Sequence, residues 1–395
     1  MRLVKKRDIN VVMYMDATLT DATWSDPKKY AWPLALSVPG LAFTGFVAWR
    51  FGFAWAWWIA PVIVFGVIPA VEMLVGDERT NPPDDAVRRL QQMPYYRWLT
   101  FLYLPAQYAA LVLCCAVWVR GGFADRAGLV ITAGIINGIG INTAHELGHK
   151  REAVERWLSR IALAATGYGH FYVEHNRGHH VRVATPEDPA SARLGESFWA
   201  FWPRTVVGGL RSAWRLECRR LRLRHHGPWS WRNDILGAWA MSLALAAGLV
   251  AAFGVAVVPF LVLQAVVGFS LLEVVNYLEH YGLCRQRNQA GRYEKVGPRH
   301  SWNSDRVVTN VFLFQLQRHS DHHGNSLLRY QALRSLDESP QLPAGYASMI
   351  VLALVPPLWR RVMDKRVVAH YGGDLSLANV QHRAAASESS ARGPR

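Results

Sequence analysis

Residues 316–323 read Leu-Gln-Arg-His-Ser-Asp-His-His and place three histidines, His319, His322 and His323, close together in the chain. In a helix, residues three and four positions apart share one face. A helical conformation here would therefore direct all three imidazoles to the same side. Imidazole is a ligand for iron, zinc, copper and nickel. A histidine-rich tract alone is equally compatible with a solvated loop, so the function of this stretch depends on the rest of the chain.

Six more histidines fall into three clusters. They are His-Glu-Leu-Gly-His at 145–149, His-Asn-Arg-Gly-His-His at 175–180, and one histidine within Asn-Tyr-Leu-Glu-His-Tyr-Gly at 276–282. A zinc ion takes three or four protein ligands, so nine imidazoles suit two metal ions. Imidazoles without abundant carboxylates favour iron, zinc or copper over magnesium or calcium. The candidate ligands are His145, His149, His175, His179, His180, His280, His319, His322 and His323.

The remaining six histidines do not share these spacings, and we expect them at the surface, in the core or behind a ligand. They are His170, His225, His226, His300, His370 and His382. His170 lies closest in sequence to a cluster.

Of the 395 residues, 51% are hydrophobic, and they are concentrated in blocks separated by basic segments. A helix needs about 20 apolar residues to cross the ~30 Å hydrocarbon core of a bilayer. Six blocks have roughly this length: 31–49, 53–75, 98–119, 127–144, 235–253 and 255–280. The sequence therefore predicts an all-α integral membrane protein with six transmembrane helices and a cytoplasmic helical cap that carries the histidines.

Lysine and arginine predict the orientation, because they are enriched in cytoplasmic loops. All but three of the 44 lie in segments that this topology puts on one side; the exceptions are Arg50, Arg120 and Arg126. Both termini and all four histidine clusters should then face the cytoplasm. The first thirty residues are polar and basic and do not match a cleavable signal peptide.

This topology divides the chain into six segments. We expect a cytoplasmic N-terminal segment at 1–30, transmembrane helices one to four within 31–144, and helices five and six within 233–280. The cytoplasmic segments 145–232 and 281–383 carry the histidines, and 384–395 is a polar tail. The apolar stretch 345–356 is too short to span, so it should be interfacial or packed in the core.

Charge and cysteine content argue against a nucleic-acid-binding protein, a disulfide framework and a cysteine metal site. Positive-inside sorting and anionic headgroups account for much of the +15 net charge, and no basic domain with its own fold suggests nucleic-acid binding. The four cysteines include no Cys-x-x-Cys pair, which disfavours a disulfide framework or a cysteine metal site.

Two further functions remain open at this point. His145, Glu146 and His149 match a zinc-protease helix, in which Glu146 is the general base, but one zinc leaves six histidines unexplained. A metal transporter would need ionisable residues deep within its spans. Glu72 lies near the end of its block, whereas Glu273 is an intramembrane carboxylate seven residues before His280.

Nearby carboxylates can hold the second ring nitrogen of a ligand histidine. The candidates by sequence proximity are Glu146, Glu174, Glu279 and Asp321. Each of them is also compatible with a solvated charge.

The histidine spacings resemble those of the membrane di-iron superfamily, which includes fatty acid desaturases and hydroxylases. Within it, the sequence resembles the bacterial alkane 1-monooxygenases. The stretches that carry the likeness are 142–150, 174–180, 276–283 and 316–323, with Ala-Thr-Pro-Glu-Asp-Pro at 184–189 and Ser-Trp-Asn-Ser at 301–304. The resemblance extends over roughly residues 30 to 375.

The resemblance implies two non-haem irons held by the nine histidines, in a bacterial inner (cytoplasmic) membrane. It implies terminal hydroxylation of medium-chain alkanes by O2, with electrons from rubredoxin, itself reduced by an NADH-dependent rubredoxin reductase. This sequence has no rubredoxin cysteine pairs, so the donor would be a separate protein or a fused domain missing from it. A membrane fatty-acyl desaturase or hydroxylase of the same superfamily is the alternative.

An alkane has no polar group, so its binding must rest on apolar burial, about 0.8 kcal/mol per methylene. We expect a channel between the spans that opens to the bilayer and ends at the metal site. Val64, Phe65 and Ile68 on the second span are candidate channel residues; a lipid-facing position is the alternative for each.

Overall fold

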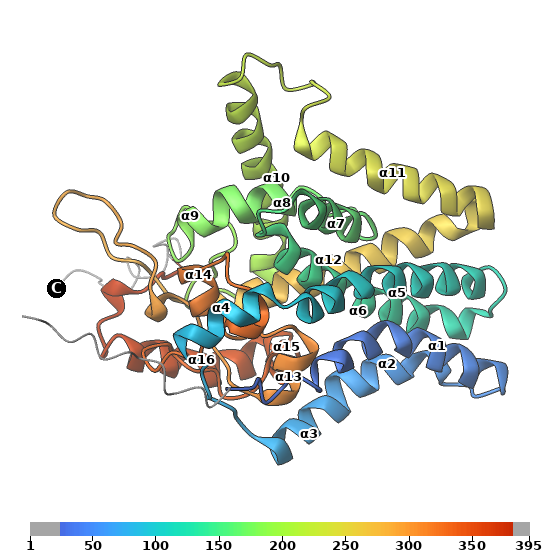
Figure 1. The fold of residues 1–395 in the computed structure, drawn as a ribbon, viewed down its shortest axis with the longest axis horizontal. Helices are drawn as coiled ribbons and strands as arrows, with labels where there is room; N and C mark the ends of the chain where they lie inside the picture. Colours follow the sequence, from blue (N-terminus) through green and yellow to red (C-terminus); the bar gives the residue numbers. More distant parts are fainter. Residues whose placement is uncertain (1–23, 382–395) are drawn as a thin grey trace, which may run out of the picture.

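A computed structural model describes residues 24–381. The predicted polar tail at 384–395, His382 and most of the predicted N-terminal segment lie outside this range. Within it the chain is helical and forms no strand, only four isolated bridges such as the one between Asp77 and Arg306. Six long helices run alongside one another, and shorter helices gather at one end of them (Figure 1).

The six long helices confirm the six predicted spans. They cover Trp32–Arg50, Ala56–Val75, Pro94–Trp118, Phe123–Gly148, Asp234–Phe253 and Val255–His280. Each is long and apolar enough to cross a bilayer, and the chain is a multi-pass membrane protein. The third begins four residues before its apolar block, because Pro94 occupies the first helical position, where a missing N–H costs nothing. The fourth runs four residues past its block and so includes His145.

The labels in Figure 1 follow the chain. The first span contains α1 (Ser37–Arg50), and the second is divided into α2 (Ile59–Val62), a π-helix (Ile63–Val67) and α3 (Ile68–Val75). The other spans are α5 (Pro94–Trp118), α6 (Phe123–Gly148), α11 (Asp234–Phe253) and α12 (Val258–His280).

Helix α6 is the centre of the bundle, and its residues from Gly128 to Gly148 are almost all buried. Glycines let α12 approach it closely. A Cβ added at Gly138 would lie 2.9 Å from the carbonyl oxygen of Gly268, and one added at Gly134 would lie 2.4 Å from Val267. Small residues spaced four apart are a usual basis for close helix packing in membranes.

Three buried amides join the long helices. Gln107 Nε2 on α5 donates to Asn137 Oδ1 on α6 at 3.0 Å, and Asn137 Nδ2 donates to Gln264 Oε1 on α12 at 2.8 Å. Because hydrocarbon offers no alternative partner, such interhelical bonds stabilise one arrangement of the helices.

The remaining helices form the cap at one end of the bundle. They are α4 (Asp84–Gln92), α7 (Ala153–Ala164), α8 (Phe171–Glu174), α9 (His180–Arg182), α10 (Phe198–Arg222), α13 (Val307–Phe312), α14 (His319–Gly324), α15 (Tyr346–Ala353) and α16 (Pro356–His370). The short apolar stretch 345–356 forms α15, whose buried residues pack in the interior.

Candidate metal centre

The nine predicted histidines lie together in two adjacent groups. One group holds His145, His149, His175, His180 and His322, and the other holds His179, His280, His319 and His323. Within each group the candidate ligand atoms all lie within 4.8 Å of one another. The groups adjoin, because the ring centroids of His180 and His323 are 4.4 Å apart. Residues from four separate segments therefore meet at one place.

The imidazole nitrogens of the five-histidine group converge. The Nε2 atom of His175 lies 3.0 Å from Nε2 of His149 and 3.0 Å from Nε2 of His180. His322 Nε2 lies 3.2 Å from His180 Nε2. His145 stands at the last turn of α6, and His149 caps that helix.

A π-helix over His175–His179 divides the second cluster between the groups. A π-turn brings residues five apart onto one side, which places His175 and His180 together and turns His179 toward the four-histidine group. Helix α14 divides the third cluster in a related way. His319 and His323 are one α-helical turn apart and share a group, while His322 joins the other.

Gly178 allows this π-turn to pack. A Cβ at this position would lie 2.6 Å from Glu174 Oε1 and 2.6 Å from Arg182 Nη2. The ion pair between Glu174 and Arg182, with 2.7 Å between Oε1 and Nη2, therefore occupies the space that any other side chain would need.

The chemistry of the groups fits metal ions. The Nε2 atoms of His145, His179 and His280 are buried and have no hydrogen-bond partner in the described part of the chain. Burial, and then the neighbouring imidazoles, lower the pKa of His175, His322 and His323 well below the usual value of 6.5. Neutral rings with free lone pairs that face a common centre are suited to bind a transition metal.

Two groups orient rings of the four-histidine group. Asp188 Oδ2 lies 2.9 Å from Nδ1 of His179, and the carbonyl oxygen of His300 lies 3.2 Å from Nδ1 of His280. Burial acts to raise the pKa of Asp188, but His179 and the Ser191 hydroxyl lower it to about 2. A carboxylate on the second nitrogen fixes the tautomer that leaves Nε2 free for a metal. Asp188 is not among the four carboxylates expected from sequence proximity, although it lies in the stretch 184–189.

The four carboxylates expected near the histidines lie in different surroundings. Glu279 Oε2 is 3.2 Å from Nε2 of His319, beside the converging nitrogens, and its Oε1 accepts a bond from Tyr346 at 2.9 Å. The other three pair with cations: Glu146 with Lys150, Glu174 with Arg182, and Asp321 with Arg334. His170 is buried but belongs to neither group.

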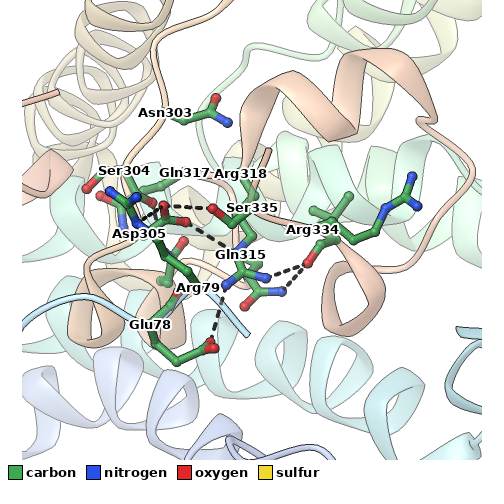
Figure 2. Close-up of polar contacts among 12 residues, drawn as sticks. Glu78, Arg79, Asn303, Ser304, Asp305, Gln315, Gln317, Arg318, Arg334 and Ser335 are labelled. Atoms are coloured by element: carbon green, nitrogen blue, oxygen red, sulfur yellow. Dashed lines mark hydrogen bonds and ion pairs between the residues drawn. The ribbon is translucent and has the colours of Figure 1, made fainter. Parts of the chain in front are cut away.

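A buried arginine holds the stretch 316–323 in position. Arg318 is 1% exposed; its Nη2 donates to the carbonyl oxygen of Glu78 at 2.8 Å, and its Nη1 donates to that of Leu333 at 2.8 Å. Figure 2 shows this side chain among Glu78, Asp305 and Gln315. Loops far apart in the sequence thus meet directly before α14.

The neighbouring residues of α14 are anchored as well. The Ser320 amide donates to Asn303 Oδ1 at 3.0 Å, and the Arg334 amide donates to Asp321 Oδ2 at 2.9 Å. Asn303 belongs to the quoted stretch 301–304. These bonds fix the helix from two sides, and with it the three histidines that it carries.

A cavity with apolar walls adjoins both groups, and its empty space, open solvent included, is about 840 Å³. Its walls include His145 and His175 from one group and His319 from the other. Val64, Phe65 and Ile68, the candidate channel residues, all line it. An apolar groove next to it, lined by Trp199, Trp202 and Val266 among others, shares Phe65, Leu271 and Ile350 with the cavity wall.

Several known proteins are similar to this chain. The fatty acid desaturase family matches residues 124–353, which contain all nine histidines. An alkane 1-monooxygenase of Acinetobacter baylyi is 45% identical, over 90% of this chain and 88% of the relative. One of Pseudomonas putida is 42% identical, over 90% and 89%. The chain belongs to the alkane 1-monooxygenase family. This confirms the resemblance seen in the sequence, and the protein is an oxidoreductase of the monooxygenase class.

A more distant relative extends the comparison. The xylene/toluene monooxygenase hydroxylase component of Pseudomonas putida is 26% identical, over 83% of this chain and 86% of the relative. In this member of the alkane 1-monooxygenase family, the two histidine groups indicate a metal site.

Proposed function

We propose that the enzyme hydroxylates the terminal carbon of medium-chain alkanes, using O2 and two electrons. The observation that carries this proposal is the apolar cavity whose walls include histidines of both groups. The two alkane 1-monooxygenase relatives support it, because their names give an alkane as the substrate.

We infer that the five-histidine and four-histidine groups each hold one iron ion. Neutral imidazoles, the free Nε2 atoms and the membership of a desaturase-related family support iron at both places. The metal pair supplies the reductive activation of O2 when bound. The protein holds the ligand rings in place through Asp188, the His300 carbonyl and the anchored helix α14.

The cavity walls bind and orient the substrate. Each buried methylene contributes about 0.8 kcal/mol, and no polar group is needed to recognise the chain. Val64, Phe65 and Ile68 would form the channel wall on the second span. The groove that shares Phe65 and Ile350 with the cavity gives a route from the bilayer, and dry walls keep water from the reacting carbon.

We further infer that rubredoxin, reduced by an NADH-dependent rubredoxin reductase, supplies the electrons. The donor would dock at the cap, which we place on the cytoplasmic side of the bacterial inner membrane, as the arginine and lysine distribution predicts. Rubredoxins are acidic, and Arg88, Lys150, Arg151 and Arg329 line one hollow of the cap. Opposite charges favour such an encounter.

A fatty-acyl desaturase or hydroxylase is the second candidate, because the same family model matches the histidine segment. A zinc protease is a weaker candidate. Its general base would be Glu146, but that carboxylate lies 3.0 Å from Lys150 Nζ and 3.3 Å from the Tyr330 amide.

A product assay tests the proposal. Purified enzyme receives octane, O2, rubredoxin, its reductase and NADH, and products are identified by mass spectrometry. We expect 1-octanol that carries one atom from ¹⁸O-labelled O2. An unsaturated product from an acyl substrate, with none from octane, would move the chemistry to desaturation.

A further inference from the structure

A second, smaller cavity lies beside the apolar one. Most of its lining surface is apolar, but several polar side chains border it, and we call it the polar cavity for these residues. Phe171, His175 and Asn276 belong to the walls of both cavities. The polar side chains that line the second cavity include Tyr168, His170, Glu174, Thr205 and Glu273. It is wide enough to admit a water molecule. The two cavities thus meet next to the five-histidine group.

Glu273 is one of two acidic residues that line this cavity. It is 3% exposed and lies in α12, within a membrane span. Its Oε1 accepts a hydrogen bond from the Tyr168 hydroxyl at 2.7 Å. Its Oε2 accepts bonds from Thr205 Oγ1 at 2.8 Å and from Asn276 Nδ2 at 3.1 Å.

Glu273 forms no ion pair with a lysine or arginine in the described residues, unlike Glu146, Glu174 and Asp321. A buried carboxyl group without a cation is costly to ionise. Carboxyl groups retained inside membrane spans are typical of proton relays.

Glu174 connects the same cavity with the surface. Its side chain is only 9% exposed. Its Oε1 is bonded to Arg182, whose side chain is 31% exposed. Glu174 lines the polar cavity, and its Oε2 is buried and has no hydrogen-bond partner in the described part of the chain. A water molecule in the cavity would donate a hydrogen bond to this oxygen. It would thereby connect Glu174, which is bonded to Arg182, with the part of the cavity that Glu273 lines.

We propose that Glu273 is a proton-relay residue that passes protons from solvent, through water in the polar cavity, to the oxygen atom that leaves as water. The inference rests on the proposed function, for which the balance is RH + O2 + 2 e⁻ + 2 H⁺ → ROH + H2O. The O–O bond and one C–H bond break, and a C–O bond and new O–H bonds form. The electrons come from the proposed rubredoxin.

Neither the alkane nor the apolar wall can supply the two protons. The polar cavity reaches the reaction space at Asn276 and His175, and Glu273 is the carboxyl group bonded to Asn276. A relay at this point delivers protons without admitting bulk water into the alkane cavity.

Three variants test the proposal against a purely structural role. Glu273→Gln keeps the volume and an acceptor oxygen but cannot transfer a proton, whereas Glu273→Asp can. The matched control is Glu72→Gln. Glu72 is another carboxylate that is 3% exposed within a span, and it accepts a bond from the Thr309 amide at 2.9 Å. It does not line the polar cavity.

The first readouts are kcat and the coupling of the reaction, measured as the H2O2 released per alcohol formed. We expect Glu273→Gln to lower kcat by about 100-fold, with unchanged KM for octane and unchanged iron content, and to release more H2O2 per alcohol formed. Glu273→Asp should recover part of kcat and show a larger solvent deuterium isotope effect than the wild type. Glu72→Gln should keep normal coupling. Wild-type kcat and coupling in Glu273→Gln would overturn the proposal.

An infrared measurement on metal-free protein gives a readout that does not depend on activity. We expect a carbonyl stretch of neutral carboxylic acid that shifts on transfer to D2O, and Glu273→Gln to lack the component of this band that the wild type and Glu72→Gln share. Ala190→Leu, which fills the polar cavity wall, should slow the shift. Absence of the band in the wild type, or an unchanged exchange rate in Ala190→Leu, would overturn the relay. A wild type that makes no alcohol would contradict the proposed function alone.

Discussion

Arg318 Nη2 donates to the carbonyl oxygen of Glu78 at 2.8 Å, although the two residues lie 240 positions apart in the chain. The contact connects the loop after the second span to the residue directly before His319. We predict that Arg318→Met lowers the free energy of unfolding by about 3 kcal/mol or more, because it leaves buried acceptors without a donor. Thermal melting and metal analysis of the purified variant measure this.

The matched control for that variant is Arg89→Met. Among the described residues, Arg89 forms an ion pair only with Asp85, and this pair is exposed. Such pairs contribute about 0–1 kcal/mol. Equal melting temperatures for the two variants would show that Arg318 does not hold α14.

Asp188 orients His179 through its Nδ1 atom. We predict that Asp188→Asn weakens metal binding at the four-histidine group by about 10- to 100-fold, as expected when a carboxylate behind a ligand histidine is lost. Competition with a chelator of known affinity measures the change. Asp321→Asn is the control, because the Asp321 carboxylate is bonded to Arg334 and, among the described residues, to no histidine. An unchanged affinity in Asp188→Asn would refute the orienting role.

Ile68 lines the apolar cavity on the second span. We predict that Ile68→Trp shortens the preferred alkane, because it removes space for methylenes, each worth about 0.8 kcal/mol or roughly fourfold in kcat/KM. Competition assays with alkanes of different length measure the shift. Val67→Trp, at a neighbouring position that is 47% exposed, should leave the preference unchanged. The same profile in both variants would rule out Ile68 as a channel residue.

The histidines also predict a pH dependence of stability. Burial, and then neighbouring imidazoles, hold the pKa of His149, His180 and His319 well below 6.5. The unfolded chain, with histidine pKa values of about 6.5, therefore binds more protons than the folded protein as the pH falls below that value. Stability should be full above about pH 6.5 and decrease as the pH falls below it.

Melting of the metal-free protein between about pH 8 and pH 5 measures this effect. His323→Gln should reduce the pH dependence, while His225→Gln, at an exposed position, should not. A melting temperature that rises as the pH falls would contradict the stated sign.

The basic hollow of the cap predicts a salt-sensitive encounter with the electron donor. We predict that Arg88→Glu with Arg151→Glu raises the KM for rubredoxin several-fold at low salt and leaves the KM for octane unchanged, because charge at a docking face acts mainly on encounter. Arg120→Glu, at the turn between the third and fourth spans, is the control. An unchanged KM at low salt would place the docking face elsewhere.

The sequence predicted what depends on local pattern. Apolar blocks alone gave the six spans, because bilayer thickness sets the length of a helix. The spacing of His145 and His149, and of His319 and His323, indicated shared helical faces, and these pairs do share groups.

Contacts between distant segments could not be predicted in the same way. The π-turn that separates His179 from His175 and His180 breaks the helical period on which the spacing argument relied. Proximity in sequence also favoured Glu146 and Asp321, but the fold gives them Lys150 and Arg334 as partners, whereas Asp188 reaches His179 across a loop.

Metal content and product, measured on one purified sample, test the central claim most directly. The two histidine groups predict about two irons per chain, with 1-octanol formed from octane, O2, rubredoxin, its reductase and NADH. His322→Ala and His323→Ala, one change in each group, should each lower the iron content. One zinc per chain with no oxygenated product would contradict the account.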